Sequence, residues 1–537
     1  MAGNNFLYQV NNRQSEKIQK AIFNQKRYIL ENCLFAVDIN PSSVNICRLR
    51  LWIELLKSSY YYQNKMGPKT LTTLPNIDIN IKVGDSLLHK FDLDYEFDMR
   101  RTDFKEYLSL VREYKETNNK RTKAKIWDKI SNLKRSFDDT ASSPELQRLK
   151  KLEVELGKAG IIDLFGDETA ETRRYEQVKK QVSEAKKVLE ARLKNPLYAG
   201  GMEWRMEFPE ILGEDGRFVG FDLVIGNPPY IFARNQSFTD EMKAYYSRNY
   251  EVSEYQANTY TIFMELAYML MRQGGTFAYI IPNNFLTIQT NSKIRQFITS
   301  NTSNVTLINS LDKIFADASV DNCIIFFKKN EPNWIEVAEL KSGEFNTIGR
   351  VNSDFFGQEP TFSISMVKYR QAVDVFHKMS NFPRLECSEV ATVNSGIKAY
   401  ETGKGTPKMT VEDKNNRIYH SKERVDEGYI RYLDGENVSR YKMSWNGEYI
   451  KYGENLAAPR DKRIFENPRI LVRQIPSHSA YAIEAVYTDT DVINHLNSMI
   501  VTNIKVNPYY LLGVINSKLI SLWFFMKFDK FQRRLFP

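Results

Sequence analysis

Cysteine and histidine are scarce in this chain of 537 residues, which contains four cysteines and five histidines. Their spacing matches neither the C-x-x-C pattern nor a paired histidine ligand set, so we expect neither a disulfide framework nor a metal site. Long apolar runs are missing too, because the most apolar stretch, residues 511–528, is interrupted by Asn516 and Lys518. The N-terminus lacks the charged-then-apolar order of a secretory signal. We therefore expect a cytoplasmic protein with no membrane partner.

Length and charge set wide limits on domain count and partners. At about 150 residues per domain, the chain predicts three or four domains, and its 42% hydrophobic and 26% charged residues are ordinary for a globular protein. Lys and Arg total 75 against 66 Asp and Glu, a net charge of +9. This mild excess is compatible with a polyanionic partner and equally with an ordinary basic protein.

The first hundred residues alternate helix-like and strand-like segments. We expect a helix over 13–31, a buried strand over 33–37, a helix over 44–56 and a strand over 77–83. Pro41, with Ser42 or Ser43, gives the second helix a start signal. This order of strand, helix and strand predicts a parallel α/β sheet.

The rest of the chain changes character twice. Residues 101–200 are denser in charge than the chain average and rich in helix formers, so we expect a helical, hairpin-like insertion. Sheet-like patterns return over 220–225, 275–281 and 322–327, with a helix around 259–272 and a helical stretch over 367–379. Beyond an expected boundary near 360–385, short strand-like pieces and turns with Tyr, Arg and Trp are typical of a recognition module.

The sharpest motif is Asn227-Pro228-Pro229-Tyr230, directly after the expected strand over 220–225. Two prolines fix an extended bend past the carboxyl end of a strand, where open α/β sheets bind their ligands. The Asn227 side-chain carbonyl and a main-chain carbonyl of the Pro-Pro segment are suited to accept from one exocyclic amino group, and Tyr230 to stack on the ring that carries it. The alternative is a rigid surface turn.

Two carboxylates also follow expected strands. Asp38 ends the first strand, where an acid commonly accepts from ribose hydroxyls, although a helix N-cap is an equal alternative. Asp85, in Gly84-Asp85-Ser86, can accept from a cofactor amino group, with Ile39 and Leu87 as apolar walls, or can be a turn residue. Three polar strand ends on one sheet edge together favour a binding site.

Several blocks of the sequence resemble the γ-class adenine-N6 DNA methyltransferases, in particular the methylase half of type IIG restriction-modification enzymes. The resemblance covers about residues 10–330, and from 385 onward the chain resembles a TaqI-like C-terminal specificity domain. The blocks are 34–41, 51–55, 84–86, 204–211, 221–230, 281–285 and 315–320. This implies a Rossmann-like methyltransferase sheet, incomplete at its N-terminus, with a helical insertion and a C-terminal α+β DNA-recognition domain.

The resemblance also implies roles and boundaries. Asp38, Ile39, Asp85 and Ser86 would hold S-adenosylmethionine, while Asn227, Pro228, Pro229 and Tyr230 would receive an adenine flipped out of double-stranded DNA. The residues expected to read the DNA are Arg440, Arg460, Arg473 and Gln474, together with the region of Gly396. The expected domains are 1–100 and 201–365 for the two parts of the methyltransferase, 101–200 for the insertion and 385–537 for the specificity domain.

The segment before Asp38 contains one glycine, Gly3. We therefore expect the glycine-rich cofactor block and the N-terminal nuclease of the type IIG pattern to be absent. Two interpretations follow: a site-specific methyltransferase of a prokaryotic restriction-modification system, or a catalytically incomplete DNA-binding subunit whose partner chain supplies the missing block. A weaker third interpretation is an RNA or protein methyltransferase.

Overall fold

The computed structural model describes residues 7–10, 12–63, 69–72, 80–89, 93, 102–117, 119–140, 144–163, 170–193, 195–198, 200–213, 217–231, 238–253, 258–315, 320–357, 361–385, 389–477, 479 and 481–528. Residues 77–79 of an expected strand, residues 316–319 and Cys387 lie outside these ranges. The contacts divide the chain into two units, Met1–Phe277 and Ala278–Pro537.

The first unit begins with the predicted alternation of helix and strand. It contains α1 (Arg13–Asn32), β1 (Ala36–Asp38), α2 (Pro41–Leu56) and β4 (Ile81–Val83). β1 and β4 are paired in parallel, with Asp38 opposite Val83, which confirms the parallel arrangement predicted for this part. α2 begins earlier than expected, because the Asn40 side chain accepts from Ser42 N at 2.9 Å and Pro41 occupies the first helical position. Between them, β2 (Tyr61–Gln63) and β3 (Lys69–Leu71) form an antiparallel ribbon.

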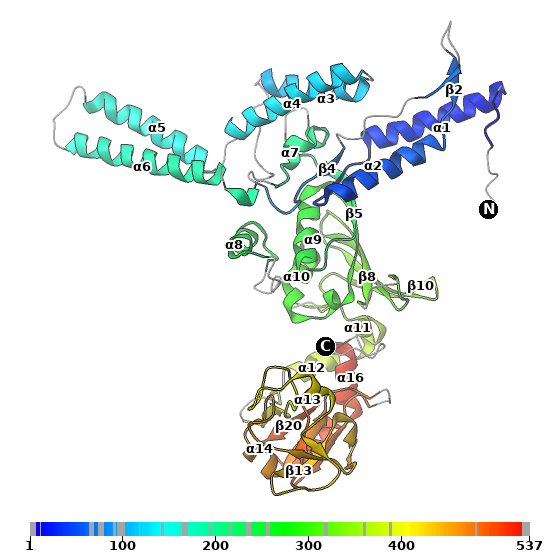
Figure 1. The fold of residues 1–537 in the computed structure, drawn as a ribbon, viewed down its shortest axis with the longest axis vertical. Coiled ribbons are helices and arrows are strands. Elements are labelled where there is room, and N and C mark those ends of the chain that lie inside the picture. Colours follow the sequence, from blue (N-terminus) through cyan, green and yellow to red (C-terminus); the bar gives the residue numbers. More distant parts are fainter. Residues whose placement is uncertain are drawn as a thin grey trace. The chain divides into compact units, whose positions relative to one another are not determined.

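The charged segment after residue 100 is helical, as predicted. Its helices are α3 (Thr102–Glu116), α4 (Lys120–Thr140), α5 (Pro144–Asp163) and α6 (Ala170–Leu193). α3 packs on α4 around Tyr107 and Ile130, and α5 packs on α6 through Leu149, Val178 and Val182 as a hairpin (Figure 1). Because these apolar side chains pair the helices, the charged faces remain in solvent.

A short segment ties this insertion to the sheet. α7 (Trp204–Glu207) and the 3₁₀ turn η2 (Pro209–Ile211) follow another 3₁₀ turn, η1 (Pro196–Tyr198). The Glu207 carboxylate lies 3.0 Å from Lys82 Nζ of β4 and 2.7 Å from Lys134 Nζ of α4. Burial lowers the pKa of Lys82; burial also acts to raise the pKa of Glu207, but the two lysines outweigh it and that pKa lies below its usual value. The paired charges therefore fix α4 on β4.

The second half of the first unit carries β5 (Phe221–Gly226), α8 (Asp240–Asn249) and α9 (Thr259–Leu270), and leads into β6 (Met271–Pro282). Phe221, at the start of β5, packs in a core with Phe208, Tyr250 and Leu266. β5, α9 and β6 confirm the predicted elements, whereas α8 was not predicted.

In the second unit, β6 belongs to a sheet with four further strands. They are β7 (Ser303–Ser310), β8 (Asn322–Lys328), β9 (Trp334–Lys341) and β10 (Glu344–Asn352). The whole order of this sheet is β10-β9-β7-β8-β6-β5. β7 pairs with β9 in parallel but with β8 antiparallel, and β9 pairs with β10 antiparallel. The parallel arrangement predicted from the first hundred residues does not extend through this sheet, which is mixed. The short turn Ser342-Gly343 joins β9 to β10 as an antiparallel hairpin. The turns η3 (Asn283–Leu286) and η4 (Gln289–Asn291) and helix α10 (Ser292–Asn301) precede β7.

The helix predicted over 367–379 is interrupted. The structure has α11 (Ile364–Lys368), the 3₁₀ turn η5 (Arg370–Ala372) and α12 (Val373–Ser380). Beyond these, two four-stranded sheets have the orders β11-β20-β17-β18 and β12-β16-β13-β19. Their strands are β11 (Thr392–Ser395), β12 (His420–Ser421), β13 (Tyr429–Leu433), β16 (Tyr449–Lys451), β17 (Arg469–Arg473), β18 (Ala485–Thr488), β19 (Ile493–Asn494) and β20 (Ser498–Thr502).

Short elements complete this α+β part. They are α13 (Val411–Asn415), η6 (Gly435–Asn437), the paired β14 (Val438–Ser439) and β15 (Lys442–Met443), α14 (Arg463–Glu466), α15 (Pro508–Ile515) and α16 (Lys518–Lys527). Buried Ile470, Val501 and Leu512 join α15 to the first of the two sheets. No helix in the described ranges is by itself long and apolar enough to cross a membrane; α15 and α16 reach that length and composition only as a pair, which is bent by 50°.

Candidate active site and nucleic-acid interface

The two predicted cofactor carboxylates follow neighbouring strands. Gly84 N donates to Asp38 O at 3.1 Å, so the turns after β1 and β4 lie side by side. The Asp38 side chain is exposed, and its Oδ1 accepts from Asn40 N at 2.7 Å. Asn40, and not Asp38, is the N-cap of α2. Ile39, between them, is 68% exposed, which leaves an apolar side chain open next to the carboxylate.

The turn at Asp85 is braced from several sides. Its Oδ1 accepts from Leu87 N at 3.0 Å, and burial raises the pKa of its carboxyl group above the usual value. The backbone N of Asp85 donates to Gly200 O at 2.7 Å, and the carbonyl of Ser86 accepts from Trp204 Nε1 at 3.3 Å. The structure therefore holds Asp85 and Ser86 in place next to the turn that carries Asp38.

The opposing segment at Gly201 was not anticipated. A Cβ atom at Gly201 would come within 2.6 Å of Leu88 O, so only glycine permits this close approach. One signal in the sequence was available, because Gly200 and Gly201 are adjacent just before the Trp204 block. The sequence gives no indication, however, that this pair packs on the segment after β4.

The four residues of the Asn227 motif come together at the end of β5. Tyr230 Oη donates to Asn227 Oδ1 at 2.7 Å. Pro228 is buried, whereas Asn227 and Pro229 are exposed and Tyr230 is half-buried. The buried proline anchors a segment whose amide and phenol side chains face each other.

Thr259, at the start of α9, clamps this segment. Its Oγ1 donates to Pro229 O at 2.5 Å and accepts from Ile231 N at 3.2 Å, and its backbone N donates to Ile231 O at 2.9 Å. The buried ring of Tyr260 meets the ring of Tyr230 edge to face, with centroids 6.2 Å apart. Sequence reasoning missed Thr259 and Tyr260, because a polar residue at a helix start indicates a cap and not a contact with a distant loop.

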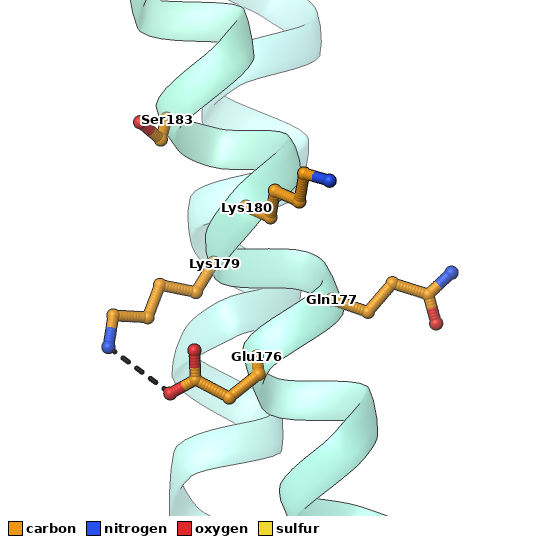
Figure 2. A pocket seen from close by; sticks show the side chains of 5 residues that line it. All are labelled: Glu176, Gln177, Lys179, Lys180 and Ser183. Atoms are coloured by element: carbon orange, nitrogen blue, oxygen red, sulfur yellow. Dashed lines mark hydrogen bonds and ion pairs between the residues drawn. The ribbon is translucent and has the colours of Figure 1, made fainter.

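The described residues contain no group of three or more metal-ligating side chains. A hollow on the surface of α6 is lined by Glu176, Gln177, Lys179, Lys180 and Ser183 (Figure 2). Its charged residues are exposed to solvent, and Lys179 Nζ lies 3.3 Å from Glu176 Oε1. None of these residues belongs to the predicted site, so the hollow does not mark it.

The predicted DNA-reading residues lie in the second unit with different partners. Arg440 Nε donates to Asn516 O at 3.1 Å, and its guanidinium covers the ring of Tyr481 at 3.9 Å. Arg473 is paired with Glu484 at 3.3 Å, while Gln474 is exposed at the end of β17. Both arginines thus have intramolecular partners.

Arg460 lies next to the predicted Gly396 region. Its guanidinium donates to Gly396 O at 3.3 Å and to Ser395 Oγ at 2.8 Å, and the residue is exposed. A Cβ atom at Gly396 would come within 2.4 Å of Asn494 O, so this segment lies directly on the strand β19. The structure brings Arg460 and Gly396 together.

Relatives of the chain are found among restriction enzymes. Residues 32–315 match the Eco57I restriction-modification methylase family, and residues 430–537 match the TaqI-like C-terminal specificity domain. The chain is 24% identical over 543 residues to a putative type II restriction enzyme and methyltransferase of Methanocaldococcus jannaschii, a match that covers 93% of this chain and 43% of that protein. It is 28% identical over 124 residues to a type II methyltransferase of Thermus thermophilus, across 22% of this chain and 28% of that protein.

Solved structures give weaker likenesses. A structure of the type IIL restriction-modification enzyme MmeI in complex with DNA superposes with a TM-score of 0.38 at 13% identity, over 56% of this chain and 42% of that one. This chain spans less than half of the M. jannaschii relative. The family match nevertheless covers more than half of the chain, so the protein belongs to the Eco57I restriction-modification methylase family and carries a TaqI-like C-terminal specificity domain.

Proposed function

We propose that this chain methylates the N6 atom of adenine in double-stranded DNA, at a specific sequence, with S-adenosylmethionine as the methyl donor and the target base flipped out of the duplex. The observation that carries this proposal is the segment from Asn227 to Tyr230, held at the carboxyl end of β5 by the Thr259 clamp. Membership of a restriction-modification methylase family supports it.

Asn227 and Pro228 are the proposed acceptors for the target amine. The adenine amino group is a poor nucleophile, because its lone pair is delocalised into the ring. Acceptors that follow its two hydrogens as the nitrogen becomes tetrahedral stabilise the transition state more than the ground state. In the structure Asn227 Oδ1 accepts from Tyr230 Oη, so we expect the Tyr230 hydroxyl to give way to the amine when the base enters. The Tyr230 ring then stacks on the base.

The turns after β1 and β4 fit a nucleoside-bearing cofactor. Asp38 offers an exposed carboxylate to ribose hydroxyls, Ile39 offers an apolar wall, and the braced turn at Asp85 and Ser86 offers acceptors to an adenine amine. These acceptors and the apolar wall therefore fit S-adenosylmethionine, which supplies the methyl group when bound. The residues of the chain bind and orient this cofactor.

We assign sequence reading to residues 385–537, with Arg440, Arg460, Arg473 and Gln474 as the proposed contacts. Arginine and glutamine donate in pairs to base edges in the major groove. Arg460 and Gln474 are exposed, whereas Arg440 and Arg473 are half-buried. All three arginines must exchange intramolecular partners for DNA. The parts 1–100 and 201–365 form the proposed methyltransferase domain, and 101–200 its insertion.

A second candidate function is a DNA-binding subunit that becomes catalytic only with a partner chain. The observation that favours it is the sheet of the first unit, where β1 and β5 each have a neighbouring strand on one side only among the described residues. In this case the chain binds DNA alone but transfers no methyl group.

The deciding experiment is calorimetric titration of S-adenosylmethionine into the chain and into Asp38→Ala, followed by tritium transfer to duplex DNA, RNA and protein. Micromolar binding that Asp38→Ala abolishes, with label in DNA, supports the enzyme. DNA affinity without cofactor binding supports the subunit. Label only in RNA or protein would contradict both.

A further inference from the structure

Positive charge is concentrated in the helical insertion. Residues 101–200 contain 23 Lys and Arg against 17 Asp and Glu, an excess of six where the whole chain has an excess of nine. Residues 385–537, to which we assign DNA reading, have an excess of four, with 22 basic against 18 acidic residues. The remainder of the chain is almost neutral. The insertion is therefore the most basic part of a chain whose proposed substrate is a polyanion.

Two of the four insertion helices carry this excess. α4 has seven basic and three acidic residues, and α6 has seven basic and four acidic residues. α5 has four of each, and α3 has three basic and four acidic residues. A balanced helix such as α5 has the mixed charge of an ordinary face in water. Because α5 and α6 form one hairpin, exposure to water alone does not explain why α6 differs.

Ion pairs within the hairpin join acids of α5 to bases of α6. Glu153 lies 3.1 Å from Lys186 Nζ, and Glu155 lies 3.3 Å from Arg174. Such exposed pairs add little stability, but they occupy acids that would otherwise repel a polyanion. The field of the hairpin is therefore set by the basic residues that have no acidic partner.

Lys180 and Lys187 are two such residues on α6. Lys179 Nζ lies 3.3 Å from Glu176 Oε1, whereas Figure 2 shows Lys180 pointing away from this pair. Lys180 and Lys187 are exposed and have no ion-pair partner among the described residues, and one exposed acid, Glu184, lies between them in the sequence. Seven residues of helix separate the two lysines by about 10 Å along the axis, so each ammonium group can reach a different phosphate.

α4 presents a similar group of cations. Arg121, Lys125 and Lys129 recur every fourth residue, so they lie on one side of the helix. All three are exposed, and in the part of the chain that the structure describes none has an ion-pair partner. One acid, Asp128, is exposed between them. The bridge through Glu207 holds the same helix on β4, so these cations belong to a fixed element of the methyltransferase part.

We propose that these faces of α4 and α6 bind the phosphates of duplex DNA, whatever its sequence, and hold the duplex while residues 385–537 read it. Each lysine that contacts a phosphate displaces a counterion from the DNA, and this release drives the association. Phosphate contacts position a duplex and carry no sequence information. The inference deepens the proposed function and rests on it for the choice of DNA as the polyanion.

Binding of the full chain to a duplex of unrelated sequence, measured by fluorescence anisotropy over a range of salt concentrations, tests the proposal. Lys180→Gln combined with Lys187→Gln should lower the slope of log affinity against log salt by about 2, because each lysine on a phosphate contributes about 1. The control, Lys17→Gln combined with Lys20→Gln, removes the same charge from exposed positions of α1. It should lower the slope by less than about 0.5.

Two further variants extend the test. Lys125→Gln combined with Lys129→Gln on α4 should lower the slope by about 2, as the α6 pair does. Glu184→Gln removes the exposed acid beside Lys180 and Lys187 and should raise the affinity about threefold at low salt, because a repulsion of the phosphates is lost. A gain in affinity cannot come from damage to the fold, so this variant separates a contact with DNA from a structural role.

Three results would overturn the proposal. An unchanged slope in the α6 and α4 variants would show that these faces do not contact DNA. An equal fall in the α1 control would show that affinity follows net charge and not these faces. Affinity for single-stranded RNA that falls in the lysine variants, with duplex affinity unchanged, would make RNA the ligand.

This inference and the proposed function fail in different ways. A chain whose lysine variants show the expected slopes but which transfers no methyl group contradicts the proposed function and leaves the inference intact. Methyl transfer to DNA by lysine variants that keep the slope of the parent contradicts the inference and leaves the proposed function intact.

Discussion

The strands β5 and β17 are similar in sequence and opposite in setting. Both are short and rich in branched apolar residues, as Phe-Asp-Leu-Val-Ile-Gly and Arg-Ile-Leu-Val-Arg show. β17 has β18 and β20 as neighbours, and Ile470 and Leu471 are fully buried. Among the strands that the structure describes, β5 has one neighbour, and its Leu223 and Ile225 are 53% and 74% exposed.

The difference teaches that apolar composition does not decide burial by itself. A strand is covered when neighbouring strands and a packed layer reach both of its sides. The specificity part of the chain supplies such neighbours from its own residues. The described residues of the methyltransferase part supply a neighbouring strand to β5 on one side.

The largest expected effect compares these two strands directly. Ile470→Ala should lower the free energy of unfolding by about 2–5 kcal/mol, because it leaves a cavity in a closed core. Leu223→Ala should change it by less than about 0.5 kcal/mol, because the side chain is already in solvent. Urea titration followed by circular dichroism measures both. Equal losses would mean that β5 is covered in solution.

Asn227→Ala tests whether chemistry and DNA reading are separate. We expect the rate of methyl transfer to fall at least 100-fold, an effect of about 3 kcal/mol, because an acceptor for the developing charge is removed. DNA affinity should stay within threefold, because the substitution removes an interaction of the chemical step and not of DNA binding. Rates of tritium transfer and fluorescence anisotropy of labelled DNA give the two values.

Tyr230→Phe is the matched control for Asn227→Ala. It keeps the aromatic ring and removes only the hydrogen bond to Asn227, which is worth about 0.5–1.5 kcal/mol. A collapse of DNA affinity in either variant would show that the segment is structural.

Low pH should destabilise the specificity part of the chain through His420. Burial lowers the pKa of His420 from 6.5 to about 4, so folding favours the neutral ring. This contribution is complete above pH 6.5 and is lost as the pH falls toward 4, by roughly 1–3 kcal/mol in total. Between pH 7 and pH 4, the free energy of unfolding of His420→Gln should fall less than that of the parent, as measured by urea titration. His377→Gln, which changes an exposed histidine, is the control and should behave like the parent.

Arg460→Ala should separate sequence reading from DNA affinity in general. We expect specific DNA binding to weaken by about 1–2 kcal/mol relative to non-specific DNA, because one side chain that contacts a base edge is lost. Competition binding at fixed salt measures the ratio. Arg463→Ala, an exposed neighbour paired with Asp461, should leave the ratio unchanged. If Arg460→Ala weakened specific and non-specific DNA binding equally, Arg460 would contact only phosphates.

The parts of the fold that follow local rules could be predicted from sequence. The helices α1 and α9, the parallel pair β1 and β4, and the strand before Asn227 have clear spacing and turn signals. The hairpin of β9 and β10 was missed although its turn, Ser342-Gly343, is local. The parallel pairing of β7 with β9 could not be predicted, because β8 lies between these two strands in the sequence. The exact beginning of α2 was missed, because Asn40 competes with the serines after Pro41 for the same role.

The candidate site divides in the same way. Asp38, Asp85 and Asn227 are recognisable because each stands at a strand end. Thr259 and Gly201 act on segments far away in the chain, and only the folded structure shows what they touch. The roles proposed for these residues, and for Arg440, Arg460, Arg473 and Gln474, stay predictions.

The Thr259 clamp also has a consequence for how this family can diversify. Ile231 and Thr259 are joined by two hydrogen bonds, so the chain between them leaves and returns at one fixed place. Lengthening a closed excursion costs only about 0.6 kcal/mol for each doubling of its length. Insertions into this stretch are therefore expected to cost little and to leave Asn227 in position, provided that they spare Tyr245, Tyr246 and Tyr250, which belong to the core.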